Sequence, residues 1–188
     1  MQNPLLSTNG VHRGSKKLAE EAAWQFTRAN PGVNFSLATI NPVMVYGPPF
    51  PGSGDLKHLG QSMSEIYALM NGSMTEVPLT LMPVFVDVRD VAEAHRLAFE
   101  ADQPLRFLLS GGVFDMQQVC DLFRDHIPKL KNRVPVGNPR KPAIVEHYIA
   151  DSSRARNVLG IKSRSFSETF LDMAEAFLEM ENSRESSL

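Results

Sequence analysis

The chain has 188 residues, of which 43% are hydrophobic and 21% are charged, and its formal net charge at pH 7 is −2. This is the composition of an ordinary globular protein, and the nearly balanced charge gives no footprint for nucleic acid or for an anionic membrane. The single cysteine, Cys120, excludes an internal disulfide. The chain has no basic and apolar leader and no apolar run of roughly 20 residues, so we expect a cytoplasmic protein without a membrane span.

The first half of the chain predicts two helices and two strands. Apolar residues at helical spacing predict a helix from Ser15 to about Asn30, which Pro31-Gly32 ends. Residues 33–46 are β-rich and almost wholly apolar, as expected of a parallel strand covered on both faces. A second helix over 56–71 and a short strand at 84–86 follow.

The second half continues the alternation. The sequence DVRDVAEAHRLAFEA (87–101) predicts a helix, and Asp87, Arg89 and Asp90 are expected to cap and orient its start. Asp115 with Gln118 predicts a capping box for a helix that ends near His126. The remaining predicted elements are strands at 105–110 and 133–136, a short helix around 152–159 and a final helix at about 167–181.

This alternation predicts an α/β fold. Only two of the predicted strands are long and apolar enough for the interior of a sheet. No strand–G-x-G-x-x-G–helix unit occurs in the 188 residues, so the dinucleotide-binding fingerprint is absent. The five histidines show neither H-x-x-x-H nor a Cys/His spacing typical of zinc, and no metal site is predicted. The sequence therefore indicates part of an α/β domain.

Seven stretches carry a family resemblance and occur in family order: GSKKLAEEAAWQF (14–26), INPVMVYGP (40–48), KHLGQS (57–62), VFVDVRDVAEAHRLAFE (84–100), RFLLS (106–110), VPVGNP (134–139) and ARNVLGIKSRSFSETFLD (155–172). Together they resemble the C-terminal part of an extended short-chain dehydrogenase/reductase of the NAD-dependent epimerase/dehydratase superfamily. The most similar group is the fungal NADPH-dependent ketone and methylglyoxal reductases.

The resemblance implies an incomplete Rossmann-type domain, with its C-terminal strands and helices only, plus a small α/β substrate lobe. Residues of about 1–50 and 84–126 would be the remnant of the dinucleotide-binding sheet and its helices. Residues of about 51–83 and 127–166 would form the substrate lobe, and 167–181 a C-terminal helix. The glycine-rich loop and the active-site serine of the family would lie outside these 188 residues.

Lys16 matches the family lysine that holds the nicotinamide ribose and lowers the pKa of an active-site tyrosine four residues earlier. Residues four apart on a helix share one face, and by this count His12 takes the place of the tyrosine. Imidazolium is a competent general acid with a reference pKa of about 6.5. However, a neighbouring ammonium disfavours its protonation, and the shorter ring misplaces its nitrogen, where an error on the order of 1 Å can cost about 100-fold in rate.

Three interpretations of His12 therefore stay open. It is a solvated residue that precedes the helix, or a surrogate acid, or the mark of an upstream junction or gene-model change that removed the tyrosine. Lys16 also suits a solvated position in the first helical turn.

Other family positions carry over individually. Pro42 and Val43 match the segment whose backbone lies against the nicotinamide, while Val45 and Ser62 match cofactor-contacting positions. Met44 matches a substrate-lining position. The implied cofactor is NADP. Each of these residues also suits an ordinary structural role, in strand core for Val43 to Val45 and on a helix surface for Ser62.

Two functions of different classes follow. The first is NAD(P)H-dependent reduction of a ketone or aldehyde, a small carbonyl substrate, by an oxidoreductase-family protein. Because the glycine-rich loop and the active-site Ser and Tyr are absent, we do not expect the isolated chain to bind NADP or to catalyse the reaction. The second is a non-catalytic remnant or fragment that acts through binding or self-association, as a homodimer formed through the helix at 15–30 or an exposed strand edge.

Overall fold

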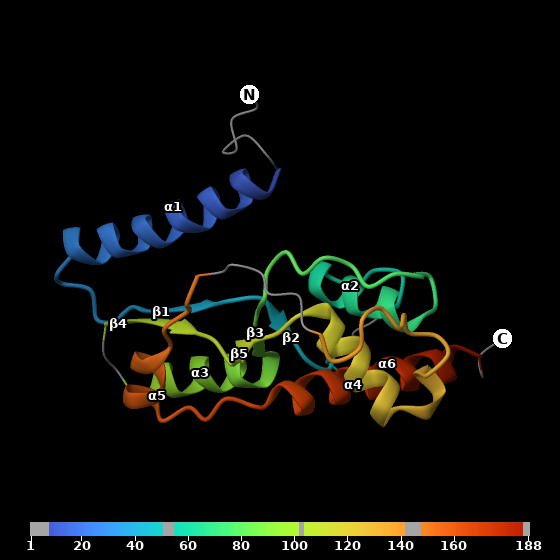
Figure 1. The fold of residues 1–188 in the computed structure, drawn as a ribbon. Helices are drawn as coiled ribbons and strands as arrows, with labels where there is room; N and C mark the ends of the chain where they lie inside the picture. The colour runs from blue at the N-terminus through green and yellow to red at the C-terminus, as the bar shows by residue number, and fades with distance from the viewer. Residues whose placement is uncertain (1–7, 51–54, 102–103, 142–147, 186–188) are drawn as a thin grey trace.

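The computed structural model describes residues 8–50, 55–101, 104–141 and 148–185, and for residues 8–13 and Glu185 it describes the backbone alone. Figure 1 shows helix α1 (Thr8–Ala29) above a small sheet, with α3 (Val88–Glu100) and α5 (Ser153–Leu159) beneath it. The helices α2 (Gln61–Met70), α4 (Met116–His126) and α6 (Phe166–Glu185) pack together at the other end. The predicted α/β class is therefore confirmed.

Helix α1 begins at Thr8, two turns earlier than the apolar periodicity predicts. The sequence of its first residues carries no periodic apolar pattern, and a helix can continue over such residues without leaving a hydrophobic signal. His12 consequently lies inside the helix, so the interpretation in which it precedes the helix is wrong.

The strands form two small groups. Strand β1 (Ala38–Pro42) pairs in parallel with β4 (Leu105–Leu109), with Ala38 opposite Leu105 and Pro42 opposite Leu109. Strand β2 (Val45–Tyr46) pairs in parallel with β3 (Val84–Asp87), which also pairs antiparallel with β5 (Gly112–Val113). All four residues of β3 are buried, whereas the side chains of β1 are partly exposed.

The single strand predicted over 33–46 is wrong, because the chain changes partner in its middle. The N–H of Val43 donates to the carbonyl of Leu109 (3.0 Å), and the carbonyl of Met44 accepts from the N–H of Val86 (2.9 Å). Residues 43–44 thus cross from β4 to β3, and residues 33–37 form no strand. Full coverage of both faces is also wrong for β1, whose residues all retain some exposure.

The predicted starts of α3 and α4 are confirmed in detail, whereas α2, predicted over 56–71, begins only at Gln61. The Asp87 carboxylate accepts from the N–H of Arg89 (2.8 Å) and caps α3, and Asp115 with Gln118 forms the complete capping box of α4. The strand predicted at 133–136 is wrong. A 3-10 turn, η2 (Pro128–Leu130), precedes it, and the N–H of Val134 donates back to the carbonyl of Leu130 rather than to a strand.

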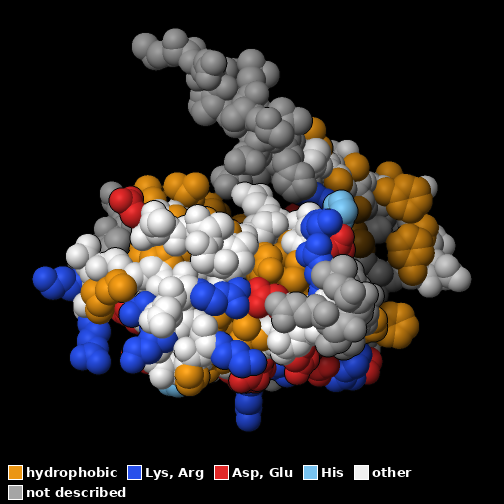
Figure 2. All heavy atoms as spheres, turned by 90° about the vertical axis from the view of Figure 1, so that its right-hand side faces the viewer, with side chains coloured by type: hydrophobic (Ala, Val, Ile, Leu, Met, Phe, Trp, Pro, Cys, Tyr) orange, Lys and Arg blue, Asp and Glu red, His pale blue; other side chains and the backbone are white. Residues whose placement is uncertain are grey.

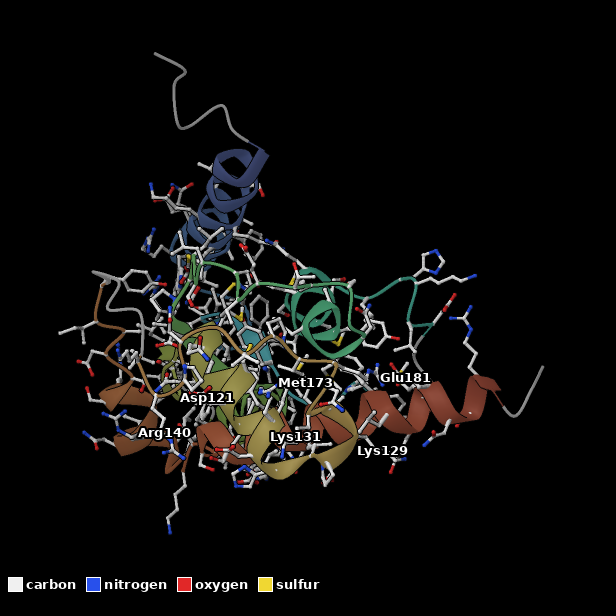
Figure 3. All side chains as sticks on the ribbon, turned by 45° about the vertical axis from the view of Figure 1, so that its right-hand side comes forward. Asp121, Lys129, Lys131, Arg140, Met173 and Glu181 are labelled. Carbon is white, nitrogen blue, oxygen red and sulfur yellow. The ribbon has the colours of Figure 1, made fainter. Side chains whose placement is uncertain are left out.

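Two hydrophobic clusters stabilise this arrangement. One joins β1 and β4 to α3 and α5. The other joins α2, α4 and α6 to Phe85 and Phe114, and Figure 3 shows its Met173 on α6 beside α4. Farther along α6, the Glu181 carboxylate binds Arg133 (2.7 Å) and thereby holds the segment after η2. No described helix has both the length and the apolar character needed to cross a membrane.

Candidate functional site

Glu20 attaches α1 to the sheet below it. Its carboxylate accepts hydrogen bonds from Thr39 Oγ1 (2.9 Å) on β1 and from Arg106 Nε (2.7 Å) on β4. Asn41 Nδ2 and Trp24 Nε1 approach the same carboxylate at 3.4 Å. We call these five residues the Glu20 cluster. It joins the first helix to both strands of the β1–β4 pair.

The Arg106 guanidinium, helped by Thr39 and Asn41, lowers the pKa of Glu20 from 4.5 to about 2 against the opposing effect of partial burial. The carboxylate is therefore ionised at neutral pH and remains so well into the acidic range. The charge strengthens the hydrogen bonds that Glu20 accepts from two different strands. Because α1 is held at two strands at once, these bonds favour one orientation of the helix.

Lys16 lies one helical turn before Glu20. Helix α1 runs in the opposite direction to β1 above it, so residues before Glu20 extend toward the C-terminal end of β1 (Figure 1). The Lys16 side chain is exposed, and no hydrogen bond or ion pair to another described residue occupies its ammonium. His12 lies one further turn away, and its side chain is outside the described part of the chain.

The segment Pro42 to Val45 lies at this same end of β1 and leads into β2. The bonds to Leu109 and Val86 described above fix its backbone from below. Ser62, near the start of α2, donates from Oγ to the carbonyl of Val45 (2.8 Å). Ser62 is half-buried, and its hydroxyl ties α2 to the strand.

A cavity of about 100 Å³ lies beside this segment. Its lining combines three methionines with a half-buried carboxylate, a buried phenol and a buried hydroxyl. The lining residues are Met44, Tyr46, Gln61, Glu65, Thr80, Leu81, Met82 and Met116. The cavity therefore has apolar walls and a few polar groups, the usual character of a small-molecule site.

The structure brings together Val43, Met44, Val45 and Ser62, and Lys16 lies on a separate helix, α1, which the Glu20 cluster attaches to the sheet. Pro42 is exposed at the end of β1. The sequence analysis missed Glu20, although its position four residues after Lys16 indicates a shared helix face.

Two larger hollows lie elsewhere. One of about 460 Å³ is formed by residues 75–80 with parts of α4 and of the segment 137–141, and one of about 430 Å³ lies between residues 34–40 and α3. Neither hollow includes Lys16, Val43, Met44, Val45 or Ser62. Within the described ranges, no group of three or more His, Cys, Asp or Glu side chains could hold a metal ion.

No family model matches the chain. It is 38% identical over 173 residues to the NADPH-dependent methylglyoxal reductase GRE2 of Saccharomyces cerevisiae, which covers 89% of this chain and 51% of that protein. The ketoreductase azaE of Aspergillus niger is 35% identical over 173 residues, covering 90% of this chain and 51% of its own length. The chain thus spans about half the length of these curated relatives.

Solved structures agree with this match. The yeast methylglyoxal/isovaleraldehyde reductase Gre2 complexed with NADPH superposes with a TM-score of 0.84 and 34% identity, over 97% of this chain and 55% of that one. Gre2 from Candida albicans superposes with a TM-score of 0.82, and the match covers 96% of this chain and 55% of that one. The described strands and helices are therefore a partial Rossmann-type α/β domain. In sequence and in fold, the chain corresponds to the C-terminal part of an extended short-chain dehydrogenase/reductase, with fungal methylglyoxal reductases among its relatives.

Proposed function

We propose that this chain contributes the nicotinamide-facing and substrate-facing part of an NAD(P)H-dependent reductase of ketones or aldehydes. The observation that carries the proposal is the arrangement at the C-terminal end of β1. There the Glu20 cluster holds α1, the helix that carries Lys16, over the β1–β4 pair, and Ser62 joins α2 to the fixed segment Pro42 to Val45. Relatives named as methylglyoxal reductase and ketoreductase support the same chemistry.

The residues present fit the nicotinamide end of NADPH, which would supply the hydride when bound. The Lys16 ammonium, with no described partner, would donate hydrogen bonds to the ribose hydroxyls. The fixed backbone of exposed Pro42 and half-buried Val43 would present a rigid surface to the ring. Met44 would line the substrate side, and its apolar side chain would exclude water from the carbonyl.

The phosphate end is a different matter, because the 188 residues contain no G-x-G-x-x-G loop. Much of the affinity for a dinucleotide comes from backbone donors around its pyrophosphate. We therefore propose that NADP binds these residues alone weakly at best. The proton donor for the carbonyl also stays a proposal, with His12 as the candidate at the position of the family tyrosine.

Trp24 gives a direct test. It is the only tryptophan in the chain and lies on the same helix face as Lys16, two turns away, so its fluorescence should be quenched by energy transfer to a reduced nicotinamide held at Lys16. Because this binding is weak, we expect quenching only at high NADPH concentration, and we expect Lys16→Met to abolish it. Lys17→Met is the matched control, because Lys17 is exposed and pairs with Glu21 instead (3.0 Å). Turnover of methylglyoxal or a small diketone, measured alongside, would establish the reductase activity.

A second candidate function is self-association. Within the described residues β1 pairs with β4 only, so its other edge presents free backbone groups that could pair with another chain. On α1, the side chains of Leu18 and Phe26 are 64% and 54% exposed. Light scattering over a range of protein concentrations tests this candidate. Self-association would be favoured over reduction if the protein formed a stable homodimer that did not bind NADPH and did not dissociate when NADPH was added.

A further inference from the structure

The methionine-lined cavity beside Met44 contains one feature that the reductase proposal does not use, the carboxylate of Glu65. Glu65 is on α2, one turn after Ser62, so both side chains lie on the helix face directed at β2. Ser62 binds the carbonyl of Val45, and Glu65 lines the cavity next to Tyr46. The same helix face therefore supports the strand and supplies a charge to the cavity.

Among the residues that the structure describes, no cation is paired with the Glu65 carboxylate. It is half-buried, and it forms no hydrogen bond or ion pair with another residue in the described part of the chain. The cavity lining contains no lysine, arginine or histidine. Partial burial raises the pKa of the Glu65 carboxyl, because the surroundings disfavour its charged form. An unpaired carboxylate in such a place lowers stability, whereas a ligand cation would remove that cost.

The remaining walls are suited to a small head group. Thr80 is 3% exposed, and its Oγ1 accepts from the N–H of Met116 (2.8 Å), which leaves its own hydrogen to be donated elsewhere. Met44, Met82 and Met116 supply flexible, polarisable thioethers that adapt to the shape of a ligand. A volume of about 100 Å³ holds a few water molecules or a group of a few heavy atoms, but not a large ring system.

One wall of the cavity reaches solvent. On the face shown in Figure 2, hydrophobic side chains are scattered among polar ones, and Lys and Arg side chains gather over the lower part. Leu81 lines the cavity and is nevertheless 76% exposed, so it lies where the cavity meets solvent.

We propose that this cavity recognises a protonated amine on a small carbonyl substrate, with the Glu65 carboxylate as its counter-ion. The proposal rests on the proposed reductase function, because Met44 joins the cavity to the segment expected to face the nicotinamide. It narrows the substrate class to amino ketones or amino aldehydes whose ammonium lies close to the carbonyl group. A neutral hydroxyl in place of the amine would gain a hydrogen bond but no charge compensation.

Binding can be measured without cofactor or turnover, so that failure of this proposal is distinct from failure of the reductase function. Three ketones of nearly equal size serve as probes: aminoacetone, hydroxyacetone and 2-butanone. Protein labelled with ¹³C at the methionine methyl groups reports directly on the walls of the cavity. We expect the signals of Met44, Met82 and Met116 to shift on titration, whereas Met173 in the core beneath α4 should not respond.

The expected result is that aminoacetone binds about tenfold more tightly than hydroxyacetone or 2-butanone. Glu65→Gln should abolish this preference, so that the three ketones bind with about equal affinity. Glu175→Gln is the control, because it removes the same charge from an exposed position on α6 and should leave the preference unchanged.

Glu65→Leu is a second variant that guards against misfolding. Replacing an unpaired, half-buried carboxylate by an apolar side chain should leave the melting temperature equal or higher, while the preference for aminoacetone is lost. The proposal is overturned if hydroxyacetone binds as tightly as aminoacetone. It is equally overturned if either Glu65 variant retains the preference, or if the methyl groups of the cavity do not respond to aminoacetone at all.

Discussion

Replacing Glu20 by glutamine should loosen the attachment of α1 to the sheet. The substitution keeps the size of the side chain and removes its charge. It also introduces amide hydrogens that face the donors of Thr39 and Asn41, so that part of the Glu20 cluster loses its acceptor. The two ion-pair bonds to Arg106, at 2.7 and 3.2 Å, would be replaced by at most one weaker bond from the guanidinium to the neutral amide oxygen.

The expected magnitude follows from the pKa. A fall from 4.5 to about 2 corresponds to at most ~3.4 kcal/mol of stabilisation. Arg106 is 58% exposed, however, while Glu20 is 18% exposed, and solvent screens such a pair. We therefore expect Glu20→Gln to lower the free energy of unfolding by about 1–2 kcal/mol.

Urea unfolding followed by Trp24 fluorescence measures this loss, because the Trp24 indole itself belongs to the cluster. Glu21→Gln is the control, since Glu21 pairs only with exposed Lys17 (3.0 Å), and its change should stay within about 0.5 kcal/mol. A double-mutant cycle with Arg106→Met should give a coupling energy of about 1 kcal/mol. The reasoning would be refuted if Glu20→Gln and Glu21→Gln were equivalent, or if the coupling energy were zero.

The same cluster sets a pH dependence. Because the folded pKa of Glu20 lies below its unfolded value, its stabilisation is complete above about pH 4.5 and is lost as the pH falls toward 2. The hydrogen-exchange protection factors of the α1 amides, which correct for the intrinsic pH dependence of exchange, should fall over this range in the natural sequence. In Glu20→Gln the protection factors should already be low at neutral pH and should change little on acidification.

Three further predictions concern the body of the fold. Asp87→Ala should lower the free energy of unfolding, measured by urea denaturation, by about 2–4 kcal/mol. It removes the cap of α3 and leaves Arg89 without a buried partner. The control is Asp125→Ala at an exposed position, which should change the free energy of unfolding by less than about 0.5 kcal/mol. Gly137→Ala should cost about 1–3 kcal/mol, since Gly137 has φ +54° and an added Cβ would lie 2.2 Å from Gln117 Oε1; an unchanged melting temperature would contradict this. Burial raises the pKa of the Cys120 thiol to about 12, so a thiol reagent should label Cys120 only after unfolding, and rapid labelling of the folded protein would show that α4 opens.

Local chemistry in the sequence predicted the two capped helix starts, those of α3 and α4, well. Asp87 and Asp115 cap their helices as expected, because capping depends on side chains and N–H groups a few residues apart. The break of the 33–46 segment at Val43 was not predictable in this way. It arises where the chain leaves β4 and joins β3, and that change of partner depends on tertiary contacts that no short window of sequence contains.

The candidate site shows the same division. The resemblance identified Lys16, Met44 and Ser62 as site candidates from motif positions, and the structure adds the contacts around them. Glu65 lies in no motif. It becomes a site candidate because it is half-buried in a cavity whose lining contains no Lys, Arg or His, and this property arises from packing. Sequence reasoning alone would treat it as one more glutamate on the polar side of a helix.

The rings of Tyr46, Phe85, Phe114, Phe166 and Phe170 pack together with centroids about 5–6 Å apart, in edge-to-face and tilted orientations. Aromatic side chains held in fixed asymmetric contact give near-ultraviolet circular dichroism, which a loosened interior loses. This group of rings lies between the strands and α6, whereas Trp24 belongs to the outermost helix. The protein thus carries two intrinsic optical probes, and melting curves recorded with each would show whether the first helix dissociates before the interior loses its packing.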